Sequence, residues 1–179
     1  MGAVRTFCLA LLLAVLTGCA ASVSRPSGGS STPIVPSIKP AAVALHIGGS
    51  PTIQGSSDWQ TFRAEWRSAF TEAAREAGYT ASYLETLPTE QPDGTILVDV
   101  NVKDYRYLTA GARYGFGIMT GNAYVNADAQ FIEFPGNRTI GTRVYSTSST
   151  AWQGVFSAMT AKQLRAISDA MLKEFSKHW

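Results

Sequence analysis

Three segments in the second half of the sequence alternate apolar and polar residues, and this pattern constrains the fold more than any other feature. In residues 95–108, valine or isoleucine occupies every second position from 96 to 102. Residues 122–134 and 138–150 show the same period of two, and Pro135-Gly136-Asn137 between them is typical of a hairpin turn. Because successive side chains of a strand point to opposite faces, the pattern predicts a sheet covered on one face only.

Two other segments repeat apolar residues at steps of three and four, which is typical of amphipathic helices. They span Asp58 to Ala77 and Ala161 to Lys177. Short strands are expected at Ala42–Ile47 and Tyr79–Leu84. The order strand, helix, four strands, helix predicts an α+β domain, with a small antiparallel or mixed sheet of four to five strands and two helices packed on one face.

The N-terminus has the organisation of a secretion signal. Residues 1–18 contain one charge, Arg5, and then an apolar run that is too short to span a bilayer. The run ends in Leu16-Thr17-Gly18-Cys19, which resembles the lipobox of bacterial lipoproteins. The resemblance implies cleavage after Gly18 and attachment of two or three acyl chains to Cys19, enough for a stable membrane anchor. Ala20, where an aspartate would favour the inner membrane, implies an outer-membrane protein facing the periplasm, with the cell surface as the alternative.

These features divide the sequence into three parts. Residues 1–18 are expected to be a signal peptide and residues 19–40 a lipidated cysteine followed by a flexible tether. Residues 41–179 are expected to form a single periplasmic α+β domain. Serine, glycine and proline dominate the tether, which shows no apolar periodicity. We therefore expect it to let the domain stand away from the membrane surface.

Cysteine, histidine and charge content argue against several functions. Cys8 leaves with the signal and Cys19 is consumed by lipid, so the mature domain has no thiol for catalysis, a disulfide or a metal site. Loss of Arg5 leaves the chain near neutral, and no run of like charges indicates a nucleic-acid partner. His46 and His178 are the only histidines, and no spacing favours a catalytic triad. We expect no cofactor, no metal and no enzymatic activity.

Two groups of residues are candidates for partner binding. The first group lies on the predicted strands. Because side chains alternate between the two faces of a strand, we expect five residues on the solvent-facing side of the sheet: Tyr105, Tyr107, Tyr124, Arg143 and Tyr145. Tyrosine and arginine are enriched at protein interfaces, and tyrosines also stack on sugar rings, although strands favour tyrosine in any case. The second group is Arg113, Tyr114 and Phe116 in the glycine-rich segment Gly111–Gly121. That segment is either a bulged, twisted hairpin end or a loop that presents apolar residues to a partner or membrane.

Several of these segments together resemble a family of uncharacterised proteobacterial lipoproteins with a shared domain of unknown function, the 4410 family. The segments are Ile96–Val102, Arg113–Gly117, Ala123–Phe131, the hairpin and Leu164–Phe175. More distantly, the chain looks like accessory lipoproteins of polysaccharide or curli export and activators of cell-wall synthases. The resemblance implies a non-enzymatic envelope lipoprotein, anchored through Cys19, that binds a protein partner or self-associates. The alternative is a glycan or peptidoglycan binder that uses the same tyrosines.

Overall fold

The computed structural model describes residues 23–24, 32–107, 123–148 and 159–176. The strands are β1 (Val23–Ser24), β2 (Ala42–Gly49), β3 (Thr80–Leu84), β4 (Thr95–Arg106), β5 (Tyr124–Phe134) and β6 (Arg138–Ser148). The helices are α2 (Pro51–Gln54), α3 (Trp59–Glu76) and α5 (Met159–Ser176). Both long helices begin and end within two residues of the bounds expected from the sequence.

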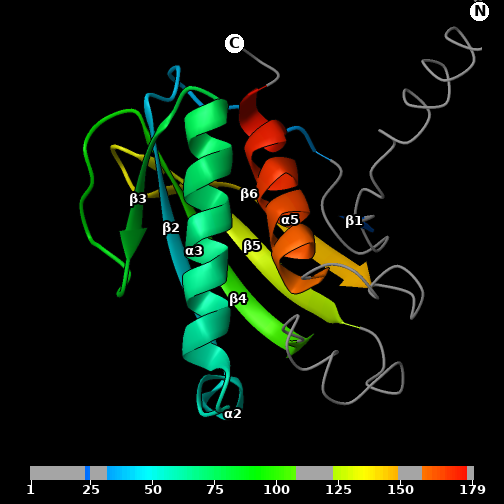
Figure 1. Cartoon of the computed structure of the whole chain (residues 1–179). Coiled ribbons are helices and arrows are strands. Elements are labelled where there is room, and N and C mark those ends of the chain that lie inside the picture. The colour runs from blue at the N-terminus through cyan, green and yellow to red at the C-terminus, as the bar shows by residue number, and fades with distance from the viewer. Residues whose placement is uncertain (1–22, 25–31, 108–122, 149–158, 177–179) are drawn as a thin grey trace, which may run out of the picture.

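The six strands form one mixed sheet, and α3 and α5 lie side by side on one of its faces (Figure 1). The strand order is β1-β6-β5-β4-β2-β3, in which β2 pairs in parallel with β3 and β4 while the other pairs are antiparallel. The α+β fold class expected from the sequence is confirmed. The sixth strand, β1, comes from the segment expected to be a tether.

The core lies between the two helices and the sheet. The apolar positions of β4 from 96 to 102 face the helices and are at most 1% exposed. The helices supply large buried side chains to the same core: Trp59, Phe62, Trp66, Phe70, Leu164, Ile167, Met171 and Phe175. Each such side chain stabilises the fold by about 1.5–3 kcal/mol relative to an exposed position. The prediction that helices cover the apolar face of the strands is therefore confirmed.

The predicted hairpin joins β5 and β6. Gly136 and Asn137 have positive φ angles of 97° and 50°. Glycine and asparagine are the residues that adopt this left-handed conformation most readily. The turn brings Glu133 opposite Arg138 in the β5–β6 register.

Residues 32–40 pack against the domain, which differs from the flexible tether expected from composition. Ile34 is fully buried in the core. It lies so close to the backbone of Gly141 that a Cβ atom there would be 2.7 Å from Ile34 Cγ1. Arg143 Nη2 donates to the carbonyl oxygen of Thr32 over 2.6 Å. The folded unit therefore begins at least nine residues before the boundary expected at Ala41.

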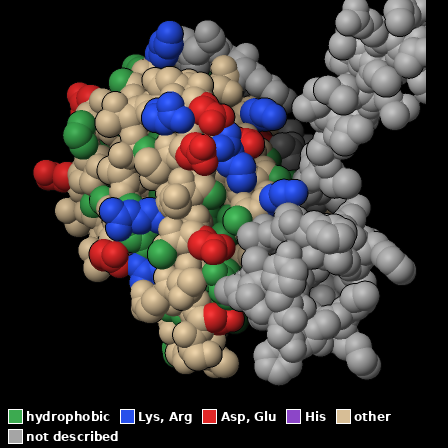
Figure 2. Space-filling model, viewed as in Figure 1, with side chains coloured by type: hydrophobic (Ala, Val, Ile, Leu, Met, Phe, Trp, Pro, Cys, Tyr) green, Lys and Arg blue, Asp and Glu red, His purple; other side chains and the backbone are tan. Residues whose placement is uncertain are grey.

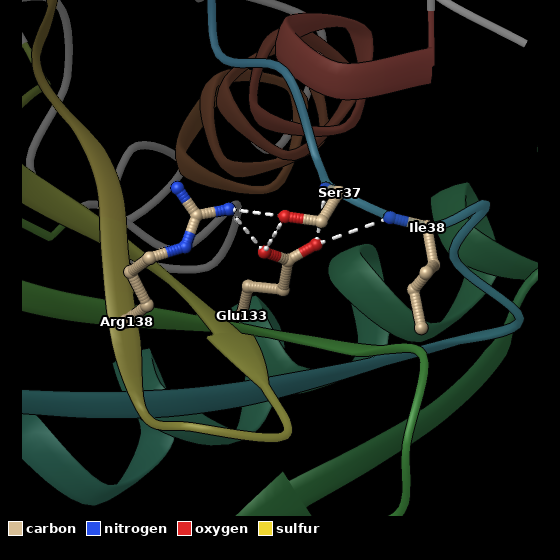
Figure 3. Close-up of polar contacts among 4 residues, drawn as sticks. All are labelled: Ser37, Ile38, Glu133 and Arg138. Carbon is tan, nitrogen blue, oxygen red and sulfur yellow. Dashed lines mark hydrogen bonds and ion pairs between the residues drawn. The ribbon is translucent and has the colours of Figure 1, made fainter.

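Glu133 holds the same segment by its side chain, as Figure 3 shows. Its carboxylate accepts hydrogen bonds from the backbone amides of Ser37 and Ile38 and from the Ser37 hydroxyl, the last over 3.0 Å. Arg138 Nη2 donates to Glu133 Oε2 over 2.5 Å. Burial alone would raise the pKa of Glu133, but these hydrogen bonds outweigh burial and hold the pKa below its ordinary value. Glu133 thus fixes the segment as a charged acceptor.

Candidate functional site

The second face of the sheet carries no helix among the residues that the structure describes. At one end of this face, Ala44, Leu97, Ile132 and Phe134 form a second, buried apolar cluster. We call the remaining, polar part the open face and define it by side chains that β2, β4, β5 and β6 direct away from α3 and α5. These are His46, Asp99, Asn101, Lys103, Tyr124, Asn126, Asp128, Gln130, Thr142, Val144 and Ser146. All of them are half-buried or exposed.

Strand register sets these residues in rows across the sheet. One row contains His46, Asp99, Gln130 and Thr142 on four adjacent strands. In the next row Asn101 lies opposite Asp128, which also forms an ion pair of 3.1 Å with Lys103. A depression of about 450 Å³ lies over these two rows. It offers carboxylate, amide and hydroxyl groups, a set suited to hydrogen bonding with a polar surface.

His46 and Asp99 form the one histidine–carboxylate pair among the described residues. His46 Nδ1 lies 2.7 Å from Asp99 Oδ1, and both side chains are partly exposed. The ring lies over Gly48, where an added Cβ would be 3.4 Å from His46 Cε1. The carboxylate fixes the orientation of the imidazole. Among the described residues, no hydroxyl group forms a hydrogen bond with His46.

Tyr105 and Tyr107 do not lie on the open face, and this part of the sequence prediction is wrong. The β4–β5 register shifts between Val102 and Asp104, and the extra residue turns the following side chains toward the helices. The ring of Tyr105 stacks on Phe62 at 4.2 Å. Tyr107 donates its hydroxyl proton to Glu65 over 2.7 Å.

The hydroxyl of Tyr105 is also engaged on the helix side. It donates to Asp58 Oδ1 over 2.6 Å, at the residue that precedes α3. Burial, together with the nearby Asp58 carboxylate, raises the pKa of Tyr105 to about 12. Burial and the Glu65 carboxylate raise the pKa of Tyr107 in the same way. Both tyrosines therefore help to pack α3 against the sheet.

Arg143 and Tyr145 are also placed on the helix-bearing face, against expectation. Tyr145 is 0% exposed, and Arg143 donates from Nε to Glu174 of α5 over 2.8 Å. Of the five strand candidates, only Tyr124 remains half-exposed on the open face, where its hydroxyl donates to Asp104 over 3.1 Å. The other three candidates, Arg113, Tyr114 and Phe116, lie outside the described residues.

Two further findings concern metal binding and membrane spanning by the described residues. They contain no group of three or more histidine, cysteine, aspartate or glutamate side chains arranged to hold a metal ion. No helix among them is both long and apolar enough to cross a membrane.

No protein-family model and no curated protein matches the sequence, so membership of the lipoprotein family that it resembles is not confirmed. Among solved structures, the PelC dodecamer from Paraburkholderia phytofirmans aligns with a TM-score of 0.49 and 13% identity, covering 87% of this chain and 98% of that chain. A protein of the unknown-function family 330 from Xanthomonas campestris aligns with a TM-score of 0.46 and 10% identity, covering 78% and 88%. Both TM-scores lie below 0.5, so these similarities do not bear on the function of this chain.

Proposed function

We propose that this chain is a lipid-anchored, non-enzymatic protein of the bacterial envelope that binds a partner protein through the open face. The observation that carries the proposal is a polar face that spans four strands and has no helix over it within the described residues. Its side chains are held by one another: Lys103 pairs with Asp128, and Ser146 donates to Asn126 over 2.6 Å. Side chains that are already ordered lose little entropy on binding, which favours a specific protein contact.

The sequence supports the anchor. Residues 1–18 have the organisation of a signal peptide, and Leu16-Thr17-Gly18-Cys19 matches a lipobox. Acyl chains on Cys19 would hold the domain at the outer membrane, facing the periplasm. The partner is then another envelope protein or a second copy of this chain.

The positions of the tyrosines favour a protein ligand over a glycan. Glycan binding would use exposed aromatic rings as stacking platforms. However, Tyr105 is stacked on Phe62, and Tyr145 is buried beneath the helices. Tyr124 is the one tyrosine left on the open face among the described residues, and a single half-buried ring is a poor platform for a sugar chain.

The test is a crosslinked pull-down of the full-length chain in detergent, analysed by mass spectrometry. Gln130→Arg introduces a long charged side chain at an exposed site in the centre of the open face. Thr61→Arg adds the same side chain at an exposed site of α3 and is the matched control. Cys19→Ser tests whether the association needs the anchor.

We expect one protein to be recovered near stoichiometry with the unmodified chain and with Thr61→Arg, and to be lost with Gln130→Arg. Recovery of this chain alone would identify a second copy as the partner. Equal recovery with Gln130→Arg would refute the open face as the contact. Recovery of no protein would refute the proposed function.

A further inference from the structure

On the opposite side of the sheet, α3 and β3 border an open groove of about 960 Å³. Its lining includes the small side chains Ala64, Ser68 and Thr71 of α3. Three arginines and Glu72 of the same helix line it, and Tyr83 of β3 and Glu85 lie on its other side. We call this site the arginine groove and define it by Arg63, Arg67, Arg75 and Tyr83. It lies on the helix-bearing side of the molecule, where basic and acidic side chains are interspersed (Figure 2).

Arg63 and Arg67 lie on the same side of α3, and Arg75 is turned by about 80° from Arg67 around the helix axis. Arg67 is four residues and Arg75 twelve residues after Arg63. Positions four apart lie on the same side of a helix. At 1.5 Å per residue, Arg67 and Arg75 are about 12 Å apart along the axis. The groove therefore presents three positive charges along α3, at axial intervals of about 6 and 12 Å.

Arg63 is fixed in place by the groove wall. Its Nε donates to the Tyr83 hydroxyl over 2.9 Å, and its Nη2 forms an ion pair with Glu85. Burial alone would lower the pKa of Arg63, but these contacts outweigh burial and raise it. The guanidinium groups of Arg63 and Arg67 lie 5.6 and 5.2 Å from the centre of the Tyr83 ring. This ring is thus occupied by cations and unavailable to stack on a sugar.

Arg67 and Arg75 are exposed and have no carboxylate partner among the described residues. The acidic residues nearby are already paired. Glu85 pairs with Arg63, and Glu72 pairs with Arg165 over 3.3 Å. Arg165 also pairs with Glu76 and Asp169, so both carboxylates that line the groove, Glu72 and Glu85, have an arginine partner. Two guanidinium groups are therefore available for an anionic ligand.

We propose that the arginine groove binds an acidic, extended segment of a partner protein. In an extended chain, side chains four residues apart point the same way and are about 13 Å apart, a length comparable with the axial separation of Arg67 and Arg75. A guanidinium group binds a carboxylate through two parallel hydrogen bonds, and the small side chains Ala64, Ser68 and Thr71 leave room for a backbone to approach.

The position of the groove favours a protein over membrane headgroups, a step that depends on the lipid anchor proposed above. β1 pairs Val23 with Thr147 of β6, so only three residues separate this edge of the sheet from Cys19. β3 lies at the other edge, about 24 Å away across five strand spacings. The edge that carries the groove is therefore the one farther from the anchor.

The test measures fluorescence polarisation of a labelled peptide in which glutamate alternates with serine, added to the full-length chain in detergent. Arg67→Gln combined with Arg75→Gln removes the two available charges. Lys162→Gln combined with Lys173→Gln removes the same charge from exposed positions of α5 and is the matched control. A peptide with glutamine in place of glutamate tests the need for carboxylates. Circular dichroism confirms that each variant is folded.

We expect the groove variant to bind the acidic peptide about tenfold more weakly, while the control variant binds as the unmodified chain does. Equal binding by all three proteins would overturn the proposal, as would equal binding of the glutamine peptide. Arginine-dependent binding of phosphatidylglycerol vesicles without binding of the peptide would also overturn it, because the ligand would then be a lipid surface. The groove variant should still recover the partner protein in the pull-down that tests the open face. The two proposals can therefore fail separately.

Discussion

Replacement of Ile34 by alanine should destabilise the domain strongly, although Ile34 lies in a Ser/Gly/Pro-rich segment. Ile34 is 0% exposed and belongs to the main core, whereas its neighbour Val35 is 51% exposed. The two positions therefore form a matched pair of branched side chains in one segment. If residues 32–40 are part of the folded unit, only the first should matter.

The magnitude follows from the atoms removed. Ile34→Ala deletes the γ and δ carbons from a buried site, and transfer alone costs about 0.8 kcal/mol per carbon. The cavity adds a further cost, because the strand backbone around Gly141 cannot collapse freely onto it. We expect a loss of about 3 kcal/mol in the free energy of unfolding, or about 10 °C in Tm for a domain of this size. Val35→Ala should change stability by less than about 0.5 kcal/mol.

The measurement is urea unfolding of the mature chain with Cys19→Ser, followed by far-ultraviolet circular dichroism. Tryptophan fluorescence provides a second probe of the same transition, because Trp59 and Trp66 are buried in the core. Equal midpoints for Ile34→Ala and Val35→Ala would refute the packing of this segment. They would instead support the flexible tether expected from composition.

Two further predictions concern titratable groups. Glu133→Gln should cost about 1–3 kcal/mol at neutral pH, measured by urea unfolding. Because the folded-state pKa of Glu133 is lowered, its contribution is present above the ordinary carboxyl pKa and lost as pH falls through the lowered value. The difference between Glu133→Gln and the unmodified chain should therefore shrink in acid, and a pH-independent difference would contradict the charged contact. Tyr105→Phe should cost about 1 kcal/mol by leaving Asp58 without its donor. Because the pKa of Tyr105 is raised to about 12, stability should fall as pH rises from about 10 toward 12, and Tyr105→Phe should lack that part of the fall.

The sequence was sufficient to predict the architecture because its periodic segments are long. Four apolar residues at alternate positions of β4 and two helical stripes of large side chains leave little choice of which faces are buried. Pro135-Gly136-Asn137 fixed the hairpin for a local reason, since its backbone conformation suits glycine and asparagine. These features are local or periodic, and single-sequence analysis detects both.

The candidate site was harder to predict, because it depends on strand register. One irregular residue between Val102 and Asp104 reverses the faces of Tyr105 and Tyr107, and no local signal marks it. In β6 the expected alternation is weaker than in β4, because Thr142 and Arg143 are both polar, and period-two counting assigned Arg143 to the wrong face. The burial of Arg143 depends on Glu174, which lies thirty-one residues later in the chain.

The packed segment also changes how the domain meets the membrane. Composition predicted that all of residues 20–40 would act as a flexible spacer, but Ile34 is buried and Val23 pairs with Thr147 of β6. If Cys19 carries the lipid, as proposed, three residues lie between it and Val23, and the four Cα-to-Cα steps span at most about 14 Å. The β6 edge would then lie close to the bilayer, and the domain could not stand away from it as a long tether allows. The open face and the arginine groove lie on opposite sides of a sheet held by that edge, so two partners could bind at once without competing for the same surface.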